Sequence, residues 1–290
     1  MSNDRTQPKT AFVFAGGGSL GAVQVGMLHS LAAHGITADM VFGSSVGALN
    51  GAYYAGTPTL EGVERLEAIW CGLRRQDVFP VTWRALLGFA WRRDFLVASS
   101  GLQRLIETHL PYRNLEDAKI PIHIVATDIL SAETVVISKG PAAPAIRASA
   151  AIPAAFAPVQ LGSLYLADGA ISSNTPVKVA VALGAQRLIV LPTGYICARP
   201  TPPAGAIANA LHALTLLIAR QLINELESLD SGIDFFVVPP LCPLTGSPYD
   251  FSQTSVLIAR ARDSTSAWLD NGGLERPRVL TQLALHKHAH

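Results

Sequence analysis

Residues 11–47 have the sequence AFVFAGGGSLGAVQVGMLHSLAAHGITADMVFGSSVG, in which a strand, a glycine-rich turn and a helix follow one another twice. The apolar run AFVFA predicts a short buried strand, and residues 20–34 predict a helix that ends at Gly35. Residues 40–42 predict a second strand, which continues through GSSVG into a helix over residues 46–55. This alternation predicts parallel strands joined by crossover helices.

The rest of the chain extends this pattern into one α/β domain over residues 10–273, with a mainly parallel sheet covered by helices. Residues 59–110 predict a helical insertion. Further strands are predicted at residues 120–130, 133–138, 163–167, 187–191 and 234–238, and further helices at about 204–229 and 252–269. A polar arm, residues 1–9, precedes the domain, and a loose tail without pattern, residues 274–290, follows it.

The composition indicates a large core and excludes some function classes. Hydrophobic residues make up 49% of the 290 residues and charged residues 15%, so the chain as a whole is not intrinsically disordered. A formal charge of +1 lacks the basic excess of nucleic-acid binders, and we expect no nucleic-acid partner. Three widely spaced cysteines fit a reducing compartment and no zinc site, and no export signal is visible, so we expect a cytoplasmic protein.

The glycine run GGGSLG, residues 16–21, follows the first predicted strand and opens a helix. Its backbone N–H groups can therefore face a negative charge. The run also satisfies the dinucleotide fingerprint G-x-G-x-x-G, with Asp39 at about the spacing of a ribose-binding acid. Asp39 precedes the second strand instead of following it, which weighs against a dinucleotide site.

The exit of the second strand carries G-x-S-x-G, in which Gly43 and Gly47 flank Ser45. Such glycines remove the Cβ atoms that would block a sharp strand-to-helix turn, the nucleophile elbow. The turn lifts the Ser45 hydroxyl out of the backbone and aims the Val46 N–H at the group that Ser45 attacks. The glycine run can supply the further donors that an oxyanion needs. The alternative is that both segments are only tight turns.

A nucleophilic serine needs a base, and the histidines of this chain fit that role poorly. They fall in predicted helices, a strand or the tail, at His29, His34, His109, His123, His212, His286, His288 and His290. Asp168 fits better, because it ends the run SLYLA beside a turn, and strand exits are where parallel sheets bind ligands. Partial burial would raise its pKa from the usual value of about 3.9 and let it take the serine proton directly. The alternative is that Asp168 only caps the turn.

The motifs GGGSLGA, GSSVG and ADGA, in this order, resemble those of the patatin-like phospholipases, lipid acyl hydrolases with a Ser-Asp dyad. The flanks IRASAAIPAAFAPV and NTPV are similar to the same family, and SQTSVLIARARDSTSAWL is similar to its bacterial branch. The resemblance spans about residues 10–270 and implies a three-layer fold. It implies Ser45 as nucleophile and Asp168 as base, and it assigns the oxyanion hole to the glycine run, Gly16, Gly17 and Gly18, beside the N–H of Val46.

The implied activity is cleavage of carboxylic esters in phospholipids or other acyl lipids through an acyl-enzyme, with no cofactor and no metal. The sequence departs from the family pattern at two places. Leu20 stands where the family often has Arg or Lys, and the D-G-G form is Asp168-Gly169-Ala170 here. Neither departure removes a reacting group.

Residues 83–96, WRALLGFAWRRDFL, begin at Trp83 and end at Leu96. The apolar side chains, including Trp91, fall on one helical face and the arginines lie off it. Such a helix can lie at a lipid interface, and we hypothesise a lid or a patch for peripheral membrane contact. An ordinary helix that packs on the core is the alternative.

We therefore expect a serine lipid acyl hydrolase. One alternative is a thioesterase or acyltransferase in which a histidine assists the G-x-S-x-G serine. A second alternative is a catalytically silent lipid-binding scaffold that keeps the fold.

Overall fold

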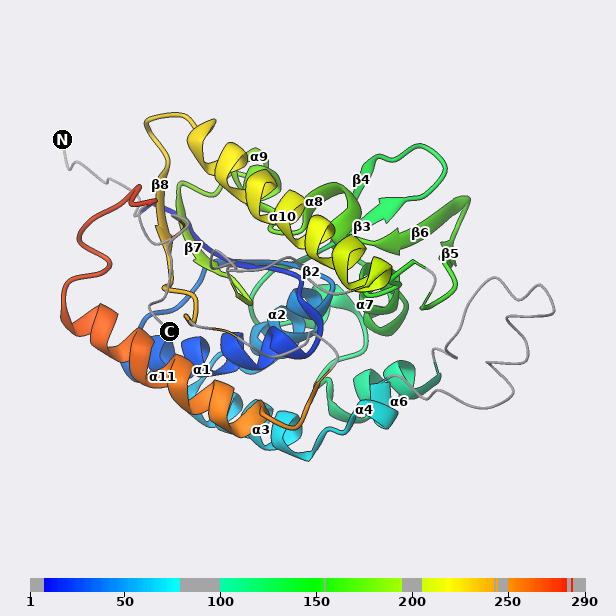
Figure 1. Cartoon of the computed structure of the whole chain (residues 1–290), viewed down its shortest axis with the longest axis horizontal. Helices are drawn as coiled ribbons and strands as arrows, with labels where there is room; N and C mark the ends of the chain where they lie inside the picture. Colours follow the sequence, from blue (N-terminus) through cyan, green and yellow to red (C-terminus); the bar gives the residue numbers. More distant parts are fainter. Residues whose placement is uncertain are drawn as a thin grey trace.

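The computed structural model describes residues 8–78, 100–153, 155–194, 205–242, 244, 250–280 and 283. They form a three-layer α/β fold in which a mixed sheet lies between two sets of helices (Figure 1). The strand order is β5-β6-β3-β2-β1-β7-β8, and β4 pairs with β3. The strands are β1 (Thr10–Phe14), β2 (Met40–Ser44), β3 (Ile122–Asp128), β4 (Thr134–Ile137), β5 (Val159–Leu161), β6 (Leu164–Asp168), β7 (Arg187–Leu191) and β8 (Asp234–Val237).

The predicted parallel arrangement is confirmed for five strands. β1 pairs in parallel with β2 and β7, β2 pairs with β3, and β7 pairs with β8. The other three strands, β4, β5 and β6, pair antiparallel at one side of the sheet. Short connections join β3 to β4 and β5 to β6, and short connections permit only antiparallel neighbours.

Ten α-helices fall within the described ranges, together with the 3-10 helices η1 (Gly18–Leu20) and η2 (Leu115–Asp117). They are α1 (Gly21–Ala33), α2 (Val46–Gly56), α3 (Leu60–Gly72), α4 (Arg75–Val78), α6 (Ser100–His109), α7 (Ala142–Ser149), α8 (Ala170–Ser173), α9 (Val177–Ala182), α10 (Ala206–Glu227) and α11 (Thr254–Asp270). Four short elements of the structure were not predicted from the sequence: β5, α7, α8 and α9. The stretch 83–96 lies outside the described residues. Within them, no helix combines the length and the apolar character that crossing a membrane requires.

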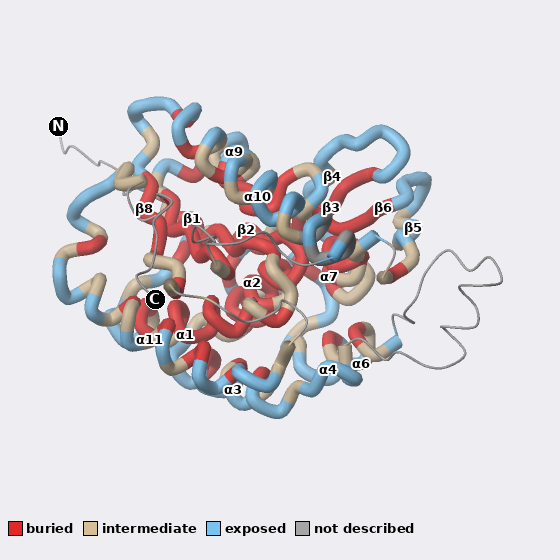
Figure 2. Tube along the Cα trace, in the orientation of Figure 1, coloured by how far each residue is buried: buried red, intermediate tan, exposed pale blue. Residues whose placement is uncertain are grey.

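Both faces of the central strand β1 are buried. Phe12 and Phe14 belong to the core cluster shared with α1, α2, α3 and α11, whereas Ala11 and Val13 belong to a second cluster with residues of α9 and α10. All four side chains are fully buried. Figure 2 shows the buried strands at the centre and exposed residues on the outer helices. Burial on both faces explains why this strand has no polar alternation in its sequence.

Strand β3 aligns the ends of two other strands along one of its edges. On this edge Ser44 of β2 pairs with Val125, and Asp168 of β6 pairs with the next residue, Ala126. β4 occupies the opposite edge. Because β2 runs parallel to β3 and β6 runs antiparallel to it, β2 and β6 meet end to end, each at its last residue. The residues at these two strand ends therefore lie together.

The described residues after Gly273 are attached to the fold. The Arg278 guanidinium donates hydrogen bonds of 2.9 to 3.1 Å to three carbonyls that follow α10, those of Leu229, Asp230 and Ile233. Leu283 is buried in the cluster beneath α10. The expectation of a loose tail is therefore wrong for residues 274–280 and Leu283. The sequence did not indicate this attachment, because single anchoring contacts leave no periodic pattern in a sequence.

Candidate active site

Ser45 lies in the sharp turn between β2 and α2. Its backbone has φ 55° and ψ −125°, a conformation that a non-glycine residue adopts only when the surroundings enforce it. The flanking glycines are needed for space, because a Cβ atom on Gly43 would lie 2.3 Å from the Gly47 carbonyl oxygen. A Cβ atom on Gly47 would lie 2.4 Å from the Phe14 carbonyl oxygen. The strained strand-turn-helix geometry is that of a nucleophile elbow.

Asp168 lies at the end of β6 and contacts the serine directly. The Ser45 hydroxyl donates a hydrogen bond of 2.7 Å to Oδ2 of Asp168. Among the described residues, no imidazole stands between the two groups. The other carboxylate oxygen, Oδ1, accepts a 2.8 Å hydrogen bond from the Ala170 N–H. Asp168 therefore caps the turn with one oxygen and binds the serine with the other. Its role as the base stays a prediction.

Burial changes the acidity of Asp168, whose exposed fraction is 3%. Desolvation raises its pKa from 3.8 to about 6, and the hydrogen bonds from Ala170 and Ser45 offset part of this rise. The group is therefore ionised at neutral pH, yet its pKa lies much closer to neutrality than that of an exposed aspartate. A carboxylate with these properties can accept a proton from a hydroxyl in contact with it.

The carboxyl end of α7 holds both partners in place. The buried Ser149 hydroxyl accepts a 2.9 Å hydrogen bond from the Ser45 N–H and donates to the Val125 carbonyl of β3. The Ser149 carbonyl accepts from the Gly169 N–H at 3.1 Å, and the Ala151 carbonyl accepts from the Asp168 N–H at 3.0 Å. This segment lies within the IRASAAIP stretch, which stood out in the sequence through its similarity to the patatin-like phospholipases.

The glycine run lies against the serine, but its three amides are not equivalent. The Gly16 N–H already donates to the Asn174 carbonyl at 3.0 Å, so the expectation that Gly16 supplies an oxyanion donor is wrong. Within the described part of the chain, the N–H groups of Gly17, Gly18 and Val46 have no acceptor. Gly18 has φ 60° and lines the same pocket as Ser45. These three amides are the donors available at the site.

Other residues singled out by the sequence lie elsewhere. Asp39 accepts a hydrogen bond from the Thr10 N–H at 2.8 Å, at the amino end of β1, whereas the glycine run follows its carboxyl end. Asp39 therefore lies at the opposite end of β1 from the glycine run and cannot bind the ribose of a dinucleotide held there. Leu20 is half-buried and packs against the main core cluster. Arg147 binds Gln103 at 3.0 Å.

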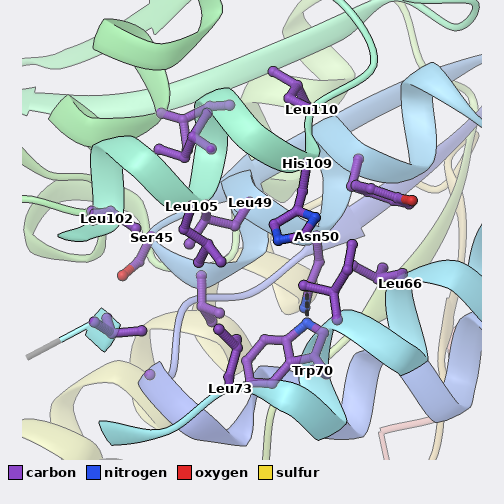
Figure 3. Close-up of a pocket in the computed structure, with 18 of the residues that line it drawn as sticks. Ser45, Leu49, Asn50, Leu66, Trp70, Leu73, Leu102, Leu105, His109 and Leu110 are labelled. Carbon is purple, nitrogen blue, oxygen red and sulfur yellow. Dashed lines mark hydrogen bonds between the residues drawn. The ribbon is translucent and has the colours of Figure 1, made fainter. Parts of the chain in front are cut away.

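Ser45 opens onto an apolar pocket of about 850 Å³, its open mouth included (Figure 3). α2, α3 and α6 contribute most of its lining, which includes Leu49, Asn50, Leu66, Trp70, Leu102, Leu105 and His109. The polar atoms of the wall are engaged in part, because the Trp70 indole N–H donates to Asn50 at 2.8 Å and Asn50 donates to Gln24 at 2.9 Å. Its walls are assembled from distant segments of the chain, and they include Ala150, Ile152 and Phe156 from the small-residue stretch 148–157, which the sequence suggested as a groove lining.

The raised pKa of Asp168 predicts a pH-dependent stability difference between wild type and Asp168→Asn. The folded state holds this proton more tightly than the unfolded state, so the stabilisation from the neutral carboxyl is complete below about pH 3.8 and lost as the pH rises through about 6. The loss amounts to about 3 kcal/mol, an order-of-magnitude figure from the size of the shift. Urea unfolding of both proteins between pH 4 and pH 7.5 measures it, since other groups titrate alike in both. A difference independent of pH would contradict the raised pKa.

Comparison with known proteins assigns the chain to a family. The sequence profile of the patatin-like phospholipases matches residues 12–181, more than half of the chain. Patatin-like phospholipase domain-containing protein ZK370.4 of Caenorhabditis elegans is 33% identical over 187 residues, which are 63% of this chain and 13% of that protein. An NTE family protein of Mycobacterium bovis is 28% identical over 194 residues, 64% of this chain and 49% of that protein.

The chain thus matches only a part of the length of each of these relatives. The similarity of its C-terminal stretch to the bacterial branch stays a prediction, because the profile ends at residue 181. Among solved structures, human GIVD cytosolic phospholipase A2 aligns with a TM-score of 0.50 at 12% identity, over 98% of this chain and 61% of that one, and shares the fold. By the profile match, this chain belongs to the patatin-like phospholipase family.

Proposed function

We propose that this protein is a serine lipid acyl hydrolase that cleaves carboxylic ester bonds of phospholipids or other acyl lipids. The observation that carries the proposal is the 2.7 Å hydrogen bond from Ser45 to a buried carboxylate at an apolar pocket. Family membership supports an ester of a lipid as the substrate. The relatives named phospholipase support the same substrate class.

In the proposed reaction, Ser45 attacks the ester carbonyl carbon while Asp168 takes the hydroxyl proton. The carbonyl oxygen becomes an oxyanion, which the N–H groups of Gly17, Gly18 and Val46 stabilise. Collapse of this intermediate expels the alcohol, which receives the proton from Asp168 and leaves an acyl-enzyme. Water then attacks the acyl carbon while Asp168 takes its proton. The C–O bond to Ser45 breaks, the fatty acid leaves, and Asp168 returns the proton to the serine oxygen. This cycle balances without a cofactor or a metal.

The pocket is suited to the acyl chain of the substrate. Its walls are built almost entirely from aliphatic and aromatic side chains, and transfer of each methylene group into such surroundings contributes about 0.8 kcal/mol. An ester bound with its chain in the pocket would present its carbonyl to Ser45, which lies on the same wall as Gly18 and Val46. The polar alcohol portion of the lipid would then face solvent.

The two alternatives are less well supported. A histidine-assisted enzyme needs an imidazole on the serine, and the Ser45 hydroxyl instead donates to Asp168. His109 does line the same pocket, so an experimental test is needed. A silent lipid-binding scaffold has no need for the strained Ser45 backbone or for a buried carboxylate, both of which cost stability.

Release of fatty acids from a lipid extract tests the proposed function. We expect wild type to release them, and Ser45→Ala and Asp168→Asn to lose this activity by about 10³-fold or more. Asp128→Asn is the matched control, because Asp128 is also buried at a strand end and caps a turn, with Leu130 and Ser131 as partners. It should retain activity.

Each alternative gives a different outcome in the same experiment. A histidine-assisted enzyme would keep its turnover in Asp168→Asn. A scaffold would release nothing, and its Ser45 would not react with a fluorophosphonate probe. Loss of activity in Asp128→Asn as well as Asp168→Asn would mean that damage to a turn, and not loss of a base, explains the result.

Peripheral membrane contact through residues 83–96 remains a hypothesis, as does a cytoplasmic location inferred from cysteine usage. In the sequence these residues lie between α4 and α6, and Val78 of α4 and Leu102 of α6 line the pocket. Replacing Trp83 and Trp91 by alanine should reduce activity on phospholipid vesicles at least about tenfold more than activity on a soluble short-chain ester. Equal losses on both substrates would exclude the hypothesis.

A further inference from the structure

Thr193 contacts the glycine run from a distant part of the sequence. It follows β7, is 6% exposed, and donates a hydrogen bond of 2.7 Å from its hydroxyl to the Gly16 carbonyl, 177 residues away. The contact is close, because a Cβ atom on Gly17 would lie 2.1 Å from the Thr193 hydroxyl oxygen. Thr193 takes no part in the proposed chemical steps.

This hydrogen bond fixes the orientation of one peptide group. In a planar trans peptide, the carbonyl of one residue and the N–H of the next point in opposite directions. Because Thr193 holds the Gly16 carbonyl, the Gly17 N–H must point away from Thr193. Asn174 fixes the preceding peptide, since its carbonyl accepts the Gly16 N–H at 3.0 Å.

The direction of the Gly17 N–H matters because the run borders the serine. A Cβ atom on Gly16 would lie 3.1 Å from Cβ of Ser45, and no described residue accepts the Gly17 N–H. Two consecutive glycines impose little preference on the peptide between them. Without a fixed carbonyl this peptide could rotate and present an oxygen, instead of a donor, to the oxyanion.

We propose that Thr193 is a positioning residue that orients the Gly16–Gly17 peptide so that the Gly17 N–H serves the oxyanion hole. The inference rests on the proposed acyl hydrolase function. Donors set in place before the reaction stabilise the transition state more than donors that must reorganise, and removal of one such donor lowers kcat by about 10²- to 10³-fold. Because loss of Thr193 would leave the donor present but unfixed, we expect a decrease of about 10- to 100-fold.

The test compares Thr193→Val, which keeps the shape and loses the hydroxyl, with Thr193→Ser, which keeps the hydroxyl. On a soluble p-nitrophenyl ester, Thr193→Val should lower kcat about 10- to 100-fold with KM within about twofold of wild type. Thr193→Ser should restore kcat to within about threefold of wild type. If Thr193→Val does not fold, Thr193→Ala, which also lacks the hydroxyl, takes its place.

Thr265→Val is the control for loss of a threonine hydroxyl buried elsewhere, because Thr265 is buried and lies in α11. It should leave kcat unchanged, while urea unfolding reports the stability of every variant. A wild-type kcat in Thr193→Val, or equal losses of kcat in the Val and Ser variants, would overturn the positioning role and leave the hydrolase function intact. A wild type inert to both the ester and a fluorophosphonate would instead overturn the proposed function, and the role of Thr193 with it.

Discussion

The site depends on one register in the sheet, the pairing of two consecutive residues of β3 with the ends of two different strands. Val125 pairs with Ser44 and Ala126 pairs with Asp168, so a single strand determines how far apart the serine turn and the carboxylate lie. A shift of one residue would turn each side chain to the opposite face of the sheet. Ser149 reinforces the register, since its hydroxyl binds both the Val125 carbonyl and the Ser45 N–H.

The same arrangement explains why stability and reactivity oppose each other at Asp168. A carboxylate removed from water is less stable than one in solution, and among the described residues two hydrogen bonds, from Ala170 and Ser45, compensate for that loss. The protein tolerates this because the surrounding core is large and buries both faces of the central strands. An exposed aspartate would be easier to ionise, but it would be a weaker base toward a hydroxyl.

Local patterns in the sequence predict much of the fold and the two reacting groups. Strands and glycine turns leave periodic signals over a few residues, and Ser45 and Asp168 each stand in a short motif at a strand end. The remaining parts depend on contacts between distant segments. No local pattern indicates that Asn174 occupies the Gly16 N–H, that Ser149 supports the elbow, or that helices from the insertion enclose the pocket. The anchoring of Arg278 is of the same kind, since its partners are carbonyl groups that every residue carries.

The position of β1 has a consequence for the order in which the molecule can be assembled. Among the described strands β1 is synthesised first, yet it lies inside the sheet, between β2 and β7. At typical rates of translation, its second neighbour, β7, leaves the ribosome roughly nine to thirty-five seconds after it. During that interval one edge of an apolar strand has no partner within the sheet, a condition that favours association with other chains. A nascent chain of this protein therefore needs protection until β7 has been synthesised.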